Sequence, residues 1–203
     1  MTEPTVDHHD EEEPKDYDKE RLELIFGNMK SGKSTELTRR IKIKSLYRRV
    51  LLVNTLKDTR YGDEGVITHD LVVTKAVRVH SLWDLLGMPE YKRAHFVGID
   101  EGNLFPEIFE FIVQALKVTK KSFIACGLDG DKNKEFFGSL HLLIPHADTK
   151  TFLTSICRRC GDGTKAPFTI DLVKFEGQVK VGGSETYESV CRRHYDDIRR
   201  QQL

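Results

Sequence analysis

The sequence predicts an α/β fold in which a parallel sheet is flanked by helices and followed by a small β-rich lobe. Three observations lead to this expectation. Short apolar segments alternate with helical ones up to about residue 150, which is typical of a parallel sheet covered on both faces. A glycine-rich turn separates the first apolar segment from the first helical one. Beyond residue 150 the helical periodicity fades, and cysteines, glycines and β-forming residues replace it.

Local signals support each expected element. Short apolar segments predict buried strands at residues 22–26, 50–54, 95–99 and 122–127. Helices are expected at residues 35–47, 81–86 and 106–118. Ser81 would cap the second helix, Gly87 and Pro89 would end it, and Pro106 suits the first turn of the third. Residues 55–70, with several glycines and aspartates, are expected to form a loop.

Length and composition limit the class of protein. At 203 residues, the chain fits one domain, or one domain with a small satellite. Apolar residues make up 38% and charged residues 32%, which excludes a chain disordered throughout. No apolar run approaches the ~18 residues of a membrane helix, so we expect no membrane association. The N-terminus lacks an apolar signal region, so we expect a cytoplasmic protein whose four cysteines favour metal binding over disulfides.

The formal net charge of zero conceals an asymmetry. Residues 1–20 contain two basic and nine acidic side chains (2 − 9 = −7), which leaves 30 basic and 23 acidic side chains (+7) for the remainder. The acidic segment is typical of a solvated, disordered tail; the alternative is a tail that shields a basic face or recruits a partner. A mildly basic body suits phosphate ligands, but it is not basic enough to indicate a nucleic-acid binder.

The strongest local signal is a G-x-x-x-x-G-K-S motif that begins at Gly27 and ends at Ser34. Glycines let the backbone curl so that successive N–H groups point at phosphate oxygens, and the following helix presents its positive N-terminus to the same anion. Lys33 would supply positive charge to the transferred phosphate, and Ser34 a hydroxyl to Mg²⁺. The motif follows a strand and precedes a helix, which indicates a sheet of the P-loop NTPase type. An ordinary glycine-rich turn is the alternative.

An acidic pair would complete the metal site. Asp100 and Glu101 directly follow the apolar strand at residues 95–99. In P-loop enzymes an aspartate at such a strand end holds Mg²⁺, which leaves Glu101 available to accept a proton from an attacking hydroxyl. The alternative is that both acids cap a helix or solvate a turn.

Two ligand pairs near the C-terminus predict a structural zinc site. Cys157-x₂-Cys160 and Cys191-x₂-His194 would together supply three thiolates and one imidazole. Such a set closes a tetrahedron with no open position, which makes the site structural rather than catalytic. Four unrelated residues, or disulfides, are the alternatives. Cys126 ends a buried strand, where simple packing is expected.

These motifs together resemble the thymidine kinase family of vertebrate cytosol, many bacteria and large DNA viruses. The resemblance extends from about residue 22 to residue 195. It rests on residues 27–35 (GNMKSGKST), 57–61 (KDTRY), 100–105 (DEGNLF), 128–130 (LDG), 137–138 (FG), 157–160 (CRRC) and 181–194 (VGGSETYESVCRRH). The phosphate loop alone is unspecific, but this ordered combination is highly specific.

The resemblance implies transfer of the γ-phosphate of ATP to the 5′-hydroxyl of thymidine or deoxyuridine. Glu101 would be the general base, and Arg60 and Lys33 would neutralise charge on the transferred phosphate. ATP and Mg²⁺ would be held by Gly27, Asn28, Met29, Lys30, Ser31, Gly32, Lys33, Ser34, Thr35 and Asp100. Positioning and electrostatics supply most of what phosphoryl transfer needs, so this inventory is chemically sufficient.

The resemblance also implies a nucleoside site next to the zinc lobe. Its residues would be Met29, Leu128, Phe137, Thr169, Val181, Gly182 and Tyr187, although plain packing would explain each one individually. The family further implies a homo-oligomer, with a tetramer favoured, and feedback inhibition by dTTP. Four segments follow: an acidic tail (1–20), a P-loop kinase domain (21–150), the zinc lobe (151–196) and a C-terminal tail (197–203).

Several residues depart from the family pattern. Asn103 and Leu104 replace glutamine and phenylalanine, Lys30 and Lys132 each replace an aromatic residue, and Asp171 replaces an arginine. These changes leave the phosphate chemistry intact and affect the nucleoside side. Two other functions therefore remain to be tested, namely a P-loop ATPase or switch, and a family member that binds nucleotides without turnover. A nucleic-acid binder is disfavoured because the basic knuckles lack interleaved aromatic residues.

Overall fold

The computed structural model describes residues 20–58, 66–67, 73–74, 76–173 and 186–201. At its centre is a six-stranded sheet with the order β5-β2-β6-β7-β1-β8, in which all neighbours are parallel. The strands are β1 (Leu22–Gly27), β2 (Val50–Thr55), β5 (Val77–Val79), β6 (Phe96–Ile99), β7 (Ser122–Gly127) and β8 (Thr149–Leu153). The predicted α/β class with a parallel sheet is therefore confirmed.

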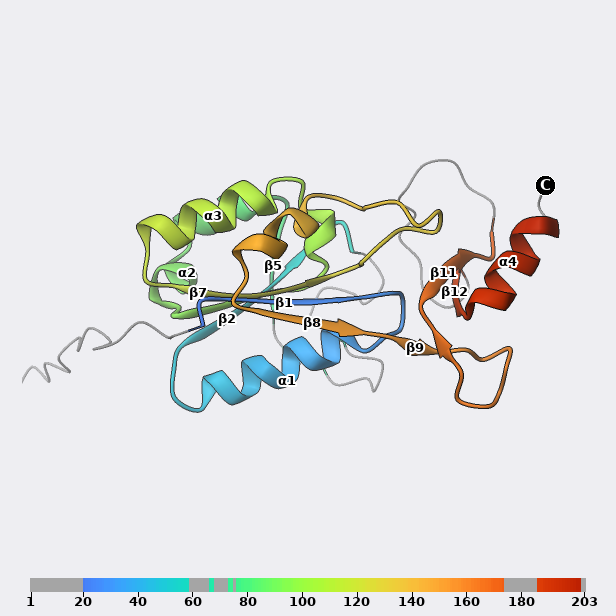
Figure 1. Cartoon of the computed structure of the whole chain (residues 1–203). Helices are drawn as coiled ribbons and strands as arrows, with labels where there is room; N and C mark the ends of the chain where they lie inside the picture. The colour runs from blue at the N-terminus through green and yellow to red at the C-terminus, as the bar shows by residue number, and fades with distance from the viewer. Residues whose placement is uncertain (1–19, 59–65, 68–72, 75, 174–185, 202–203) are drawn as a thin grey trace, which may run out of the picture.

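Helices cover both faces of the sheet (Figure 1). On one face lies α1 (Lys33–Ser45), and its Leu37 and Ile41 pack against Ile25 of β1. The other face is covered by α3 (Ile108–Val118), the short α2 (Pro89–Arg93) and the 3₁₀ helices η1 (Leu82–Gly87) and η3 (Leu140–His146). Alternate residues of β1 enter the two cores, as expected for a strand buried on both sides. No helix in the described ranges is long and apolar enough to cross a bilayer.

The helix ends near residues 81–89 and the loop at residues 55–70 agree in part with the expectations from the sequence. Ser81 caps η1 with a reciprocal capping box to Asp84, as its position predicts. η1 ends at Gly87, as expected, and Pro89 opens the next helix, α2, because proline is well suited to a first helical turn. The loop expected at residues 55–70 is also interrupted: β2 runs through Thr55, and β3 (Val66–Ile67) pairs antiparallel with β4 (Val73–Thr74).

Within residues 151–173 and 186–201, the second lobe contains two small antiparallel sheets and one helix. It comprises β9 (Ser155–Ile156), β10 (Lys165–Ala166), β11 (Phe168–Asp171), β12 (Tyr187–Val190) and α4 (Arg192–Gln201). Its separate core is built from Cys157, Ala166, Ile170, Val190, Cys191 and Tyr195. The segment limits expected from the sequence do not coincide with elements: residue 150 lies inside β8, and residues 197–201 continue α4 rather than form a tail. Residues 1–19 of the expected acidic tail lie outside the described ranges.

The two lobes are joined by a short connection. Only Thr154 separates β8, at the edge of the central sheet, from β9 of the zinc lobe. The lobe consequently lies beyond the carboxyl ends of the parallel strands (Figure 1), the edge at which α/β proteins bind ligands.

Candidate active site

The glycine-rich motif forms the turn between β1 and α1. Gly27 ends β1, where an added Cβ would meet the carbonyl oxygen of Leu153 and the hydroxyl of Ser31, so only glycine fits. Gly32 has φ +89° and precedes the first turn of α1, a conformation that favours glycine. The Lys33 Nζ atom, within a buried side chain, donates to the carbonyl oxygen of Asn28 at 2.9 Å. The loop thus places the N-terminus of α1 and one lysine at the same point.

The acidic pair lies beside this loop. Asp100 follows β6 and is 3% exposed, and its Oδ1 atom accepts the hydroxyl of Ser34 at 3.0 Å. Glu101 has φ +49°, which is uncommon outside glycine, and its backbone N–H also donates to Asp100 Oδ1, at 3.0 Å. The structure therefore brings Ser34 next to Asp100, which lies 66 residues further along the chain, and next to its neighbour Glu101.

Cys126 is an unexpected member of this cluster. Its thiol, which the sequence suggested was merely packed, donates to the same Asp100 oxygen at 2.9 Å. Burial, and then the nearby Asp100, raise the pKa of the Cys126 thiol, so it stays protonated and can donate. Burial, followed by the charge of Glu101, also raises the pKa of Asp100 to about 6, despite the opposing hydrogen bonds from Cys126 and Ser34. Burial thus favours the protonated form of the Asp100 carboxyl group.

The chemistry of this cluster suits a magnesium-bound phosphate. A serine hydroxyl and a carboxylate are hard oxygen donors, which Mg²⁺ prefers. Lys33 and the N-terminus of α1 add positive charge at the position where a phosphate would lie. The buried carboxylate of Asp100 would be stabilised by the incoming cation, because an opposite charge favours its ionised form.

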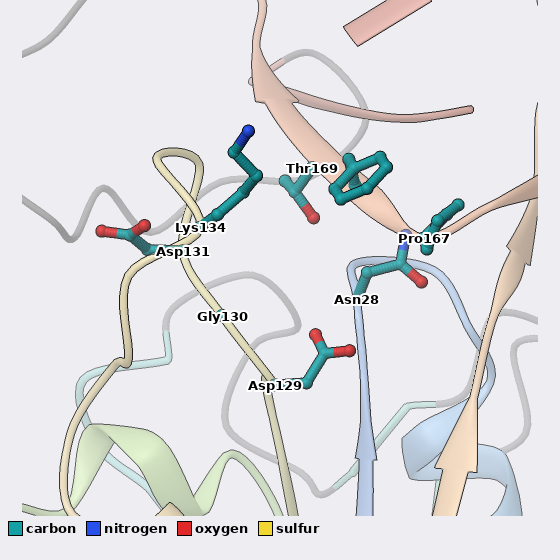
Figure 2. A pocket seen from close by; sticks show the side chains of 8 residues that line it. Asn28, Asp129, Gly130, Asp131, Lys134, Pro167 and Thr169 are labelled. Atoms are coloured by element: carbon teal, nitrogen blue, oxygen red, sulfur yellow. The ribbon is translucent and has the colours of Figure 1, made fainter. Parts of the chain in front are cut away.

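A cavity of about 170 Å³ lies between the phosphate loop and the zinc lobe. It is lined by Asn28, Asp129, Gly130, Asp131, Lys134, Pro167, Phe168 and Thr169. Figure 2 shows that these residues come from the turn after β1, from the segment after β7, and from Pro167 and the β11 strand that follows it. The cavity therefore lies where the two lobes meet. Of the residues expected to bind a nucleoside, Thr169 lines it directly.

The structure describes four more of the expected nucleoside residues, namely Met29, Leu128, Phe137 and Tyr187. Thr169 Oγ1 accepts the backbone N–H of Met29 at 3.3 Å. The Leu128 N–H donates to Asn103 Oδ1 at 3.0 Å, and the Asn103 amide nitrogen is buried without a partner among the described residues. Tyr187 is 9% exposed, and Phe137 is partly buried. The expected Arg60, Val181 and Gly182 lie outside the described residues.

Two departures from the family pattern meet in space. Lys132 Nζ lies 3.2 Å from Asp171 Oδ2, and Arg199 of α4 lies 3.4 Å from the other Asp171 oxygen. The Lys132 carbonyl oxygen also accepts the Tyr195 hydroxyl at 3.0 Å. The segment after β7 is therefore fastened to β11 and α4 at the rim of the cavity, a connection that the sequence did not reveal.

The four predicted zinc ligands converge. Their ligand atoms all lie within 4.8 Å of one another: Cys160 Sγ is 3.7 Å from Cys191 Sγ, and His194 Nδ1 is 3.3–3.6 Å from the three sulfurs. A tetrahedral zinc ion with ordinary bond lengths requires edges of about 3.8 Å between sulfurs and about 3.6 Å between sulfur and nitrogen. The cluster of Cys157, Cys160, Cys191 and His194 could therefore hold Zn²⁺ with little adjustment.

The environment of Cys157 also favours the thiolate that zinc needs. Burial opposes its ionisation, but hydrogen bonds from the Cys191 backbone, from His194 and from Cys160 outweigh it and lower the pKa of Cys157 to about 6. All four cysteines are free thiols in the structure, so the disulfide alternative finds no support.

Comparison with known proteins identifies related chains. The family model described as "Thymidine kinase" matches residues 20–195. The chain is 35% identical to "Thymidine kinase" of Oryza sativa subsp. japonica, with 87% of this chain and 66% of the rice protein covered. It is 39% identical to "Thymidine kinase, cytosolic" of Gallus gallus, covering 90% of this chain and 80% of that protein. It is also 38% identical to "Thymidine kinase" of Myxoma virus (strain Uriarra), covering 86% and 96%. The chain thus matches nearly the full length of the viral relative, but just under two thirds of the rice one.

Proposed function

The chain belongs to the thymidine kinase family, and on that premise we propose that it transfers the γ-phosphate of ATP to the 5′-hydroxyl of thymidine, with deoxyuridine as a second substrate. The observation that carries this proposal is the convergence of Ser34 and Asp100 within 3.0 Å at the phosphate loop, with Glu101 adjacent. A phosphate site with an acid beside it fits transfer to a hydroxyl.

Each residue has a distinct role in the proposed reaction. The backbone N–H groups of residues 27–35 bind the phosphates, and Lys33 neutralises the charge that develops on the transferred group. Ser34 and Asp100 would hold Mg²⁺, which would supply charge neutralisation. Glu101 accepts the proton of the 5′-hydroxyl as the oxygen attacks, and Arg60 adds positive charge during the transfer. Burial of Asp100 and Glu101 strengthens these interactions by excluding water.

The nucleoside is proposed to bind where the zinc lobe meets the phosphate loop. Thr169, Met29 and Leu128 lie around this junction, and Tyr187 lies in β12 of the lobe. Val181, Gly182 and Phe137 complete the proposed set. The zinc ion would be structural, because the four ligands fill its tetrahedron. We further propose a cytoplasmic homo-oligomer, with a tetramer favoured, that is inhibited by dTTP at the nucleoside site.

A single assay tests this function against its alternatives. ATP consumption with Mg²⁺ is measured with thymidine, deoxyuridine, deoxycytidine and the purine deoxynucleosides, and without nucleoside. The proposal expects turnover only with thymidine and deoxyuridine. Turnover that is independent of nucleoside would indicate an ATPase instead, and ATP binding without any turnover would indicate a member that has lost catalysis.

A further inference from the structure

The side chain of Asn28 joins the phosphate loop to the zinc lobe. Its amide nitrogen donates to the carbonyl oxygen of Ala166 at 2.7 Å, and its amide oxygen accepts the backbone N–H of Ser155 at 3.2 Å. Ser155 and Ala166 are register partners in the β9–β10 ribbon. The Asn28 carboxamide thus behaves as a peptide group inserted at the end of that ribbon, two residues before the zinc ligand Cys157. Figure 2 shows this side chain directed towards the lobe, beside Pro167.

The next two residues of the loop are attached to the same lobe. The carbonyl oxygen of Met29 accepts the Ser189 hydroxyl at 2.5 Å, and its N–H donates to Thr169 at 3.3 Å. Lys30 Nζ donates to the carbonyl oxygen of Tyr187 at 3.1 Å. Five hydrogen bonds therefore run from three consecutive loop residues to β9, β10, β11 and β12. The bond from Asn28 to Ala166 is buried and the other four are partly buried. Such hydrogen bonds fix conformation, because leaving a buried partner unpaired is costly.

These contacts act on the groups that would bind phosphate. The carbonyl oxygen of Asn28, whose side chain is held by the lobe, is the acceptor for Lys33 Nζ. Lys30 has φ +59°, a left-handed conformation that a lysine adopts only when its surroundings hold it there. Contacts with the zinc lobe thus help to set the direction of the loop N–H groups and the position of the Lys33 side chain.

We propose that Asn28 and Ser189 are positioning residues that hold the phosphate loop in its binding conformation against the zinc lobe, so that the state of the lobe determines the affinity for nucleotide phosphate. The inference rests on the proposed function only in assuming that this loop binds phosphate. The Ser189 hydroxyl proton is already donated to the carbonyl oxygen of Met29, so in this conformation the hydroxyl has no proton to donate to a phosphate. An effect of Ser189 on phosphate binding must therefore travel through the loop.

The test compares binding of Mg-ADP to the full-length, zinc-loaded protein and to Asn28→Ala, Ser189→Ala and the double variant. Binding is measured by calorimetry, and amide exchange of residues 28–33 is measured by mass spectrometry. We expect each single variant to bind Mg-ADP about threefold to tenfold more weakly and to exchange these amides faster. Because both residues act on one loop, the affinity of the double variant for Mg-ADP should fall by less than the product of the two single fold-changes. The exposed amide variant Gln114→Ala on α3 is the matched control.

Zinc content is measured for every variant to separate a local effect from a collapsed lobe. Unchanged affinity and unchanged loop exchange in Ser189→Ala, with one zinc per chain, would overturn the inference. Should Asn28→Ala lose zinc and fold poorly, Ser189→Ala still decides, since it leaves the loop sequence intact. Failure of the parent protein to bind Mg-ADP would instead count against the proposed function. The amide exchange rates of residues 28–33 would then show by themselves whether Asn28 and Ser189 hold the loop in place.

Discussion

Lys132 and Asp171 form an ion pair of 3.2 Å between side chains that are only 9% and 8% exposed. Each residue taken alone departs from the pattern of the family, with a lysine in place of an aromatic residue and an aspartate in place of an arginine. Together they are complementary in charge, and they join the segment after β7 to β11. The two departures therefore meet in one ion pair, next in sequence to Asp131 and two residues from Thr169, which line the cavity.

A double-mutant cycle tests this pair. We expect Asp171→Asn to lower the free energy of unfolding by about 2–4 kcal/mol, because it removes the acid that faces Lys132 and Arg199. Lys132→Met should cost less, about 1–3 kcal/mol, because Arg199 still lies beside Asp171. In the combined variant, the loss in free energy of unfolding should be smaller than the sum of the two single losses by about 1–3 kcal/mol. Urea denaturation measures these values. Asp197→Asn is the control: its pair with Arg200 is largely exposed, and its loss should cost under about 1 kcal/mol. Strict additivity of the two buried substitutions would show that the pair is energetically uncoupled.

The role of Glu101 is tested by Glu101→Gln. The amide keeps the shape of the side chain but cannot accept the proton of the attacking hydroxyl. We expect turnover to fall by about 100-fold or more, while the Kd for Mg-ADP changes by less than about threefold. Steady-state kinetics and calorimetry measure the two quantities. Glu110→Gln, on the exposed side of α3, should leave both unchanged, and near-normal turnover of Glu101→Gln would remove it from the role of base.

The buried Asp100 predicts a pH-dependent stability. Its pKa is raised from 3.8 to about 6, mainly by burial and then by Glu101. Because the folded state holds this proton more tightly than the unfolded state, the associated stability is fully present below about pH 4 and is lost as pH rises through 6. Asp100→Asn should therefore reduce the fall in the free energy of unfolding between pH 4 and 7. It should also stabilise the magnesium-free, zinc-loaded protein at pH 7.5 by at most about 3 kcal/mol.

Urea denaturation at several pH values, without Mg²⁺, measures this effect. The exposed acid variant Asp197→Asn should keep the pH dependence of the parent protein. An Asp100→Asn variant with the parent's slope would show that this carboxyl group is not the source of the dependence.

The zinc site is tested by metal content. We expect about one zinc ion per chain, since the four ligands form one closed tetrahedron. Cys160→Ser should lose most of this zinc under competition by a chelator, and the zinc lobe should become less stable. Cys126→Ser removes a cysteine that lies outside the cluster and bonds to Asp100, so its zinc content should match that of the parent. A folded parent protein without zinc would contradict the assignment.

The features that residue spacing within a short segment encodes were predictable from the sequence. The glycine-rich turn, the acids after an apolar strand and the paired ligands Cys157-x₂-Cys160 and Cys191-x₂-His194 each have a local pattern. Their grouping follows from simple rules, because parallel strands end at one edge of a sheet and one ion needs four ligands. The parallel sheet and the convergence of the four ligands were predictable for these reasons.

Contacts between distant side chains were not predictable in this way. The bonds of Asn28 to Ser155 and Ala166 span 127 and 138 residues, and an asparagine carries no signal that names its partner. Cys126 looked like an apolar residue at the end of a strand, and only the order β6-β7 places its thiol beside Asp100. Lys132 and Asp171 were recognised separately as unusual, but complementary charge alone cannot establish a pair across 39 residues.

The single residue between β8 and β9 has a mechanical consequence. With only Thr154 as a spacer, the backbone offers about two soft torsions between the lobes. A reorientation of the smaller lobe would therefore pivot at Thr154. It would be opposed by the hydrogen bonds of residues 28–30 and by the contacts of Lys132 with Asp171 and Tyr195. Because residues 28–30 are bonded to the lobe at a distance from Thr154, a small rotation of the lobe would displace the glycine-rich turn.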